Sequence, residues 1–363
     1  MIVLLLGFAT SLFITFFIIR SARTHSHFSG DIDMTGPQKF HAMPVPRVGG
    51  LGIIAGLSAA LVALWIWQGV DMTLGITLLA CSTPAFLAGL AEDLTKTQSP
   101  RRRLFFTVVS ASLAAWALGA IIQRTDIPGL DWAVSFIAPA IFVTVFMVAG
   151  MANAVNIIDG FNGLAAMCVV MMLGAIAYVA FQAQDRVVLL CALAGLGAVM
   201  GFFVWNFPAG LIFLGDGGAY FLGFYVAELS ILLVHRNPSV SPLCPLLMCI
   251  YPIFETMFSM YRRKFIRGRP IGMPDGVHLH SLIYRRLMRW AVGNKNAKVL
   301  TKRNSMTAPY LWMLCMLSVI PATVFWNSSG ALAFFFIVFA SAYVFLYSRI
   351  VRFKVPNWLI VRH

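Results

Sequence analysis

The stretch NAVNIIDGFNGLA, Asn153 to Ala165, is a short polar segment between two long apolar runs. Its polar side chains recur at every third position, as Asn153, Asn156, Asp159 and Asn162. At a helix end this spacing would place the four side chains on one face. A polar stripe at the mouth of a membrane helix is costly unless something polar binds there. The stretch therefore predicts a binding site, and a helix end facing water is the alternative.

The surrounding composition is that of a membrane protein. Of the 363 residues, 60% are hydrophobic and 11% are charged, whereas soluble domains carry roughly 25% charge. Because a spanning helix needs about 20 mostly apolar residues, we predict an all-α polytopic membrane protein, a single domain over residues 1–363 with about eleven transmembrane helices. The predicted spans are 1–19, 48–67, 73–91, 104–122, 135–152, 163–181, 187–204, 217–235, 241–260, 308–326 and 330–348.

The basic residues predict the orientation of these spans. If the N-terminus lies outside, 24 of the 27 Lys and Arg residues fall on inner segments and three on outer ones. Lys and Arg accumulate on the cytoplasmic side, so we expect the C-terminus and the polar inner loops to be cytoplasmic. The net charge of +14 then reflects this topology and an attraction to anionic lipid and phosphorylated substrates, and it does not indicate nucleic acid.

Acidic residues and glycines gather at the inner ends of the spans. In AEDLTKTQSPRRRL, the adjacent Glu92 and Asp93 precede several basic residues, a setting that favours metal binding or proton transfer. In FLGDGG, Asp216 lies in a glycine-rich turn at a helix start. There, exposed backbone N–H groups would leave room for a phosphate. Two further carboxylates, Glu228 and Glu255, fall within spans and are either functional or helix-packing partners of inner arginines.

The largest inner loop, 261–306, contains DGVHLHS with His278 and His280. Apolar residues follow at helical spacing with arginines between them, which predicts an amphipathic helix on the inner membrane surface. These apolar residues are Leu279, Ile283, Leu287 and Trp290. Acids, bases and a glycine turn on one side of the membrane are the groups that Mg²⁺-dependent phosphoryl transfer requires. Zinc hydrolysis is disfavoured because the chain has no HExxH motif.

Four motifs in this order, AEDLTK, NAVNIIDGFNGLA, FLGDGG and DGVHLH, resemble those of the polyprenyl-phosphate N-acetylhexosamine-1-phosphate transferases. The resemblance runs from Lys39 to about Arg286. It implies transfer of a sugar-1-phosphate from a UDP-N-acetylhexosamine to undecaprenyl phosphate, with release of UMP and with Mg²⁺ (or Mn²⁺) as cofactor. It also implies a multi-pass protein of the bacterial inner membrane whose active site faces the cytoplasm.

The resemblance also implies roles for individual residues. Asp216 is the expected metal ligand, and Phe213 is expected to lie against the uracil. The expected catalytic residues are Glu92, Asp93, Asp159, His278 and His280. The expected substrate-binding residues, Phe213 included, are Lys39, Arg47, Lys96, Arg103, Asn153, Asn156, Asn206 and Phe213.

Three departures from the family pattern bear on the substrate. Glu92 replaces an aspartate, Asn162 stands where many members have a second aspartate, and HLHS replaces three consecutive histidines of the muramoyl-pentapeptide branch. The chain is more similar to the branch that initiates O-antigen or other surface polysaccharides. A UDP-GlcNAc-specific initiator of common-antigen or teichoic type remains an alternative, as does a solute transporter. The sugar is left open, and so is the oligomeric state, for which a homodimer is one expectation.

Overall fold

The computed structural model describes residues 1–21, 45–268, 270, 276–287 and 297–352 of the chain. These residues form helices and no β-strand, as the all-α prediction requires. The helices are α1 (Ile2–Arg20), α3 (Gly49–Gln68), α4 (Thr73–Thr95), α5 (Pro100–Leu118), α6 (Leu130–Val134), α7 (Ile137–Ile158), α8 (Leu164–Gln182), α9 (Arg186–Asn206), α10 (Gly215–Arg236), α11 (Leu243–Met248), α12 (Ile250–Tyr261), the π-helix η1 (Arg262–Ile266), α13 (Leu279–Leu282), the π-helix η2 (Ile283–Leu287), α15 (Ala297–Val324) and α16 (Ser329–Val351).

Nine of the described helices are long and apolar enough to cross a membrane. The predicted span at 104–122 corresponds to α5, which is not among these nine. Its first turn carries three arginines, which makes the helix too highly charged to qualify. The predicted span at 241–260 is broken at Cys249 into α11 and α12, each too short to cross alone. Pro252 explains the break, because it has no N–H to donate to the carbonyl of Met248.

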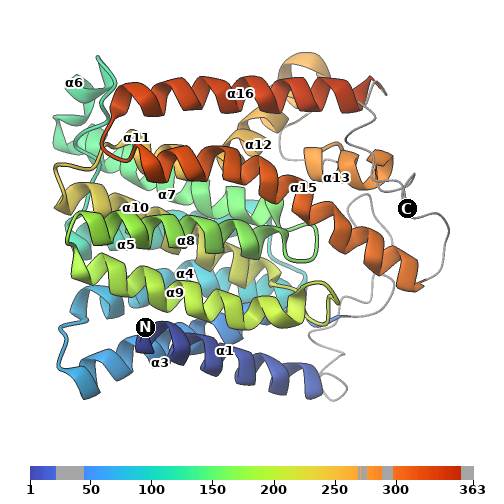
Figure 1. Cartoon of the computed structure of the whole chain (residues 1–363), viewed down its shortest axis with the longest axis horizontal. Helices are drawn as coiled ribbons and strands as arrows, with labels where there is room; N and C mark the ends of the chain where they lie inside the picture. Colours follow the sequence, from blue (N-terminus) through green and yellow to red (C-terminus); the bar gives the residue numbers. More distant parts are fainter. Residues whose placement is uncertain (22–44, 269, 271–275, 288–296, 353–363) are drawn as a thin grey trace.

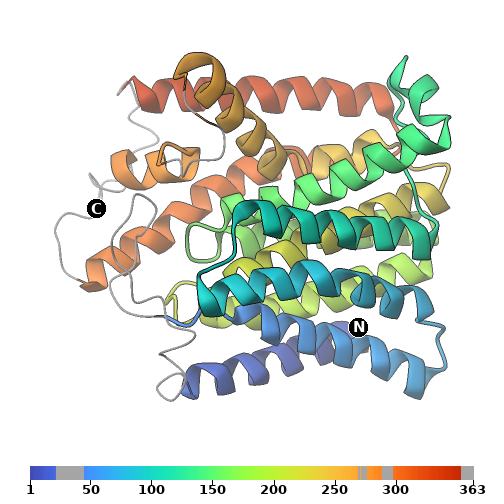
Figure 2. The ribbon, with the colours of Figure 1, turned by 180° about the vertical axis from the view of Figure 1, so that it is seen from behind.

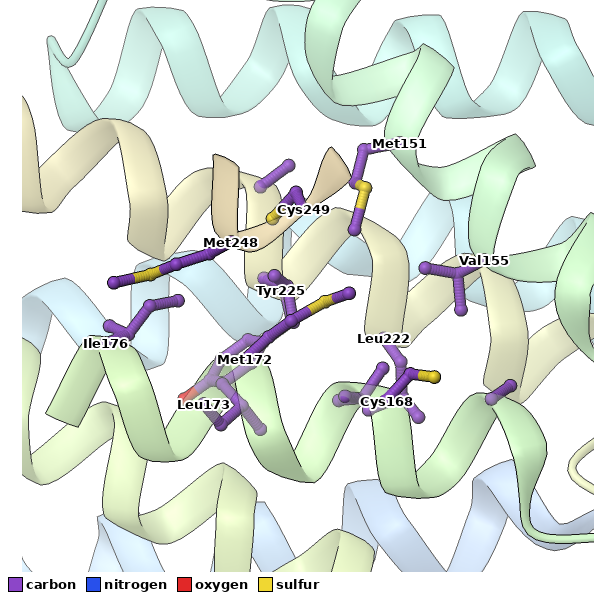
Figure 3. Packing of buried hydrophobic residues seen from close by; sticks show 14 of the residues in the cluster. Met151, Val155, Cys168, Met172, Leu173, Ile176, Leu222, Tyr225, Met248 and Cys249 are labelled. Carbon is purple, nitrogen blue, oxygen red and sulfur yellow. The ribbon is translucent and has the colours of Figure 1, made fainter. Parts of the chain in front are cut away.

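The long helices lie side by side, with α1 and α3 at one edge and α16 at the other (Figures 1 and 2). Helix α10 lies inside the bundle against α3, α4, α7 and α8, and every residue from Gly215 to Leu233 is buried. Figure 3 shows this core, in which Leu222 and Tyr225 of α10 lie among side chains of α7 and α8. A helix that is apolar on nearly all sides is stable only in such a buried position. The helices around α10 therefore also hold its first turn in place.

The segment that follows the histidine motif differs from the prediction. It is helical over α13 and η2, but Leu279, Ile283 and Leu287 are only 0–3% exposed. Helices α15 and α16 pack against it, and Arg286 donates to the carbonyl of Ile350 at the end of α16 (2.7 Å). The apolar stripe therefore faces protein. Trp290 lies outside the described residues, and the position of the 261–306 loop on the membrane stays a prediction.

Candidate active site

Asp216 is the centre of a charged cluster at one end of the bundle. Its side chain lies in the first turn of α10 and is reached from three other segments. Its Oδ1 accepts hydrogen bonds from Asn156 Nδ2 at 3.1 Å and from Arg47 Nη2 at 3.4 Å. Its Oδ2 accepts from Arg103 Nη1. The structure thus brings together four of the predicted residues, which lie up to 169 positions apart in the sequence.

Asp93, at the end of α4, holds the start of α10 in place. Its Oδ1 accepts from the backbone N–H of Asp216 (2.8 Å) and its Oδ2 from that of Gly217 (2.9 Å). The side chain is buried, and Arg47 Nε lies 3.7 Å from Oδ1. The GDGG turn was expected to offer these N–H groups to a phosphate, and that expectation is wrong, because Asp93 already satisfies two of them.

Glycines allow this close contact between helices. A Cβ on Gly89 of α4 would lie 2.6 Å from Gly217 Cα, and one on Gly50 of α3 would lie 2.6 Å from Gly218 Cα. The glycines of the turn therefore permit helix packing. Backbone bonds join the same elements, because the N–H groups of Gly49 and Gly50 donate to the carbonyls of Phe213 and Leu214 at 3.0 Å. The chain entering α3 is thereby fixed beside Asp216.

The stretch Asn153–Ala165 does not form one polar face. Asn153 donates to the carbonyl of Ala149 in its own helix (2.8 Å), whereas Asn156 reaches Asp216. Helix α7 ends at Ile158, so Asp159 and Asn162 leave the helical register. Asn162 is buried and donates to Ser305 Oγ (3.2 Å). The shared-face prediction is wrong beyond Asn156, because it assumed a helix that continues through the glycines.

Asp159 caps the end of α7 beside the cluster. Desolvation raises the pKa of Asp159 to about 7, against the attraction of Arg47, which lowers it. A carboxyl group with a pKa near neutrality is suited to holding or releasing a proton. Asp159 therefore stays a candidate for acid–base work.

The remaining predicted residues of these loops have other contacts. Glu92 Oε2 accepts from the backbone N–H of Gln98 (2.7 Å) and so closes the turn after α4. Lys96 ends α4 with an exposed side chain and φ of 54°. The side chain of Phe213 is half-buried, and its backbone N–H donates to Pro46 O (2.9 Å). Lys39 lies outside the described residues, so its role stays a prediction.

Asn206, which we expected to bind substrate, is a structural residue. Its Oδ1 accepts from the N–H of Gly163 (2.6 Å) and its Nδ2 donates to the carbonyl of Ile212 (2.7 Å). The side chain is 5% exposed. Both ends of the amide are therefore occupied by backbone, and the prediction is wrong because the side chain is turned inward to join two loops.

His278 and His280 form a second group next to the first. Their rings stack with centroids 5.1 Å apart. A Cβ on Gly160 would meet His280 Nε2 at 3.2 Å, so this glycine makes room for the imidazole directly after Asp159. His278 Nδ1 is 2.9 Å from Glu255 Oε1. The histidine motif thus lies against the NAVNIIDGFNGLA turn, and its catalytic role stays a prediction.

Sequence reasoning missed two aromatic residues. The Arg103 guanidinium lies 5.9 Å from the centre of the Tyr220 ring, one turn beyond Asp216, and Tyr343 of α16 donates to Glu255 (2.7 Å). The spacing of Tyr220 from Asp216, at i+4, could have indicated the first. No local signal indicates Tyr343, because it is distant in the sequence from every motif.

The described residues contain no group of three or more His, Cys, Asp or Glu placed to hold a metal ion. Mg²⁺, however, is usually bound by one or two carboxylates together with substrate phosphates and water. The nearly buried Asp216 carboxylate, which offers oxygen ligands between two guanidinium groups, fits that mode of binding. It does not fit a metal held by protein side chains alone.

Residues 75–234 match the model of a family described as glycosyl transferase family 4. A Bacillus subtilis (strain 168) protein named "Probable undecaprenyl-phosphate N-acetylglucosaminyl 1-phosphate transferase" is 29% identical over 81% of this chain and 80% of its own length. An undecaprenyl-phosphate alpha-N-acetylglucosaminyl 1-phosphate transferase of Thermotoga maritima is 28% identical over 76% and 81%. A phospho-N-acetylmuramoyl-pentapeptide-transferase of Streptococcus gordonii is 36% identical over 39% and 42%.

Proposed function

We propose that this chain is a member of glycosyl transferase family 4, whose model matches residues 75–234, and that it transfers an N-acetylhexosamine-1-phosphate from a UDP-sugar to undecaprenyl phosphate. The observation that carries the proposal is the cluster of Asp216 with Arg47, Arg103 and Asn156 at one end of a membrane bundle. Two guanidinium groups beside a carboxylate are suited to a diphosphate that arrives with a divalent cation. The relatives that match most of the chain are named for this class of reaction.

The reaction exchanges one P–O bond for another. An oxygen of the lipid phosphate attacks the phosphorus that carries the sugar. The bond from that phosphorus to the bridging oxygen breaks, and UMP leaves with that oxygen. A phosphate monoester has a second pKa near 6, so the lipid phosphate is mostly a dianion at neutral pH and needs little help from a base.

The residues of the cluster divide the work between charge and position. Arg47 and Arg103 neutralise charge on the diphosphate as it is transferred. Asp216 would hold Mg²⁺ (or Mn²⁺), which would supply further charge neutralisation when bound. Asp93 keeps Asp216 at the start of α10, and Asn156 orients its carboxylate. Asp159 takes up the proton of the minor fraction of lipid phosphate that is still a monoanion.

For the sugar we propose N-acetylglucosamine, with other N-acetylhexosamines as the alternative. The support is that the Bacillus subtilis and Thermotoga maritima relatives, which each match more than three quarters of the chain, carry N-acetylglucosaminyl in their names. The HLHS sequence and the partial match to the muramoyl-pentapeptide enzyme also favour the branch that initiates surface polysaccharides. We further propose that the site faces the cytoplasm at the bacterial inner membrane, where basic inner loops would meet anionic lipid. A homodimer stays a prediction.

The decisive experiment incubates the purified protein with Mg²⁺, undecaprenyl phosphate and one UDP-sugar at a time, and measures both UMP and the lipid product. We expect UMP release with UDP-GlcNAc that depends on undecaprenyl phosphate and equals the sugar transferred to lipid. Release of UMP without the lipid would indicate a hydrolase. Absence of UMP with every UDP-sugar would overturn the proposal, and a transporter would give that result.

A further inference from the structure

Beneath the histidine motif lies a buried carboxylate that belongs to neither the charged cluster nor the motif. Glu255, in α12, is 1% exposed. Its Oε1 accepts from the backbone N–H of Leu279 (3.1 Å) and lies 2.9 Å from His278 Nδ1. Its Oε2 accepts from the hydroxyl of Tyr343 in α16 (2.7 Å). Both carboxylate oxygens are therefore bonded, and two other segments of the chain, the histidine motif and α16, converge on them.

The contacts run from Glu255 toward the reaction site. His278, held at Nδ1, stacks on His280 at an interplanar angle of 11°. His280 in turn packs edge-on against Phe161, with centroids 5.5 Å apart, and beside Gly160. These two residues directly follow Asp159. A rotation of the His278 ring would thus displace His280 where the site begins.

We propose that Glu255, braced by Tyr343, is a positioning residue for the transferase reaction: it fixes the ring orientation of His278 and, through the stacked rings, of His280. A carboxylate bonded to one nitrogen of an imidazole sets which nitrogen faces outward, as in other histidine sites where an outer partner fixes the tautomer. Here Nδ1 is engaged, so Nε2 of His278 is the nitrogen left for the substrate side.

Helix α16 thereby takes part in positioning the histidines. Tyr343 is fully buried and packs against Phe254 and Phe258 of α12. Helix α16 therefore holds Glu255 from behind, although it contributes no residue to the charged cluster. This inference rests on the proposed function, since it concerns the same reaction.

The test is a double-mutant cycle of Glu255→Gln and His278→Ala, with kcat and KM measured in the UMP assay. Glutamine keeps the shape of the side chain but removes its charge and one acceptor oxygen. We expect kcat to fall about 10- to 100-fold with little change in KM for the UDP-sugar, the range seen when partners of functional histidines are removed. In the His278→Ala background the same change should have little further effect, because residues that act as a unit are not additive. Tyr343→Phe should also lower kcat, but by a smaller factor than Glu255→Gln.

Glu228→Gln is the matched control. Glu228 is a buried carboxylate in α10, and neither of its oxygens has a hydrogen-bond partner among the described residues. Its neutralisation should leave kcat unchanged. The positioning role would be overturned if the losses of kcat for Glu255→Gln and His278→Ala multiply in the double variant, or if Glu255→Gln is as active as wild type. Turnover by the wild-type protein would still support the proposed function in either case.

A second measurement tests the geometry without turnover. A proton shared between an imidazole nitrogen and a buried carboxylate gives a low-field NMR resonance. We expect one in protein labelled with ¹⁵N-histidine, lost in Glu255→Gln and retained in Glu228→Gln. Its absence from the wild-type protein would overturn the inference, and an inactive wild-type protein that shows it would overturn only the proposed function.

Discussion

Replacing Asp93 with asparagine would remove one of the two hydrogen bonds that hold the start of α10. The remaining side-chain oxygen can accept from one of the two N–H groups, at Asp216 or Gly217, while the new NH₂ group faces the other. A bond to a charged group contributes about 1.5–3 kcal/mol, and a buried donor left unpaired costs about 1–3 kcal/mol. Because these two figures partly describe the same loss, they do not add in full, and the start of α10 should lose roughly 2–4 kcal/mol of positional stability.

If this loss falls on the transition state, kcat should drop about 30- to 1000-fold, because each 1.36 kcal/mol is tenfold in rate. The assay is UMP release by Asp93→Asn from pH 6 to 9, with Glu92→Gln as the neighbouring control. The Glu92 carboxylate accepts from the Gln98 N–H in the turn after α4 and not from α10. The decrease in kcat of Glu92→Gln should therefore be smaller. A positioning role predicts a deficit that is about equal across this range. A rate that returns to the wild-type level in alkali would refute the reasoning and identify Asp93 as a base.

Asp216→Asn should keep less than about a tenth of wild-type turnover at saturating Mg²⁺, because an amide binds a hard cation poorly; higher activity would exclude Asp216 as the main ligand. Asn206→Ala should lower the thermal midpoint, by two lost buried hydrogen bonds of about 1 kcal/mol each, without raising KM for the UDP-sugar; a raised KM would restore its binding role. Burial alone would raise the pKa of Asp185, but bonds from Arg236, Val188 and Asn237 lower it. Its stabilisation is therefore present above about pH 4 and lost as pH falls through the lowered value, and Asp185→Asn should abolish that dependence in acid melts. Raising salt should weaken UDP-sugar binding, since exposed charges are screened within about 8 Å at physiological ionic strength; titration in detergent showing salt-independent affinity would count against it.

Nine of the eleven predicted spans correspond to described helices that are long and apolar enough to cross a membrane, because a membrane imposes length and composition on each helix separately. The same local reasoning predicted that Asp216, Arg47, Arg103 and Asn156 lie on one side of the membrane, and the structure brings all four into one cluster. It could not decide which polar side chains face the substrate. Asn206 and Asn156 have the same chemistry and similar positions, yet one bonds two backbone groups and the other bonds Asp216.

That choice is made by tertiary contacts. Asn206 turns inward because Gly163, with φ of +73°, presents an N–H that nothing in its own turn satisfies. Asp93 turns onto α10 because Gly89 and Gly217 bring the two helices close enough. Neither contact is visible in a motif, because each depends on the approach of a helix that is distant in the sequence. A polar residue that contacts the charged cluster and one that only holds the backbone therefore look alike before the fold is known.

The two arginines on Asp216 explain how a site for a diphosphate can be stable before the substrate arrives. An isolated carboxylate this far buried would be costly, and so would two guanidinium groups held near each other without a counter-charge. Paired, they satisfy one another at the start of α10. If a UDP-sugar binds here with its cation, as we propose, Arg47 and Arg103 would turn to the phosphates and the Asp216 carboxylate would be left for the metal ion. Asp216 would keep its place during such an exchange, because the Asp93 carboxylate holds the start of α10.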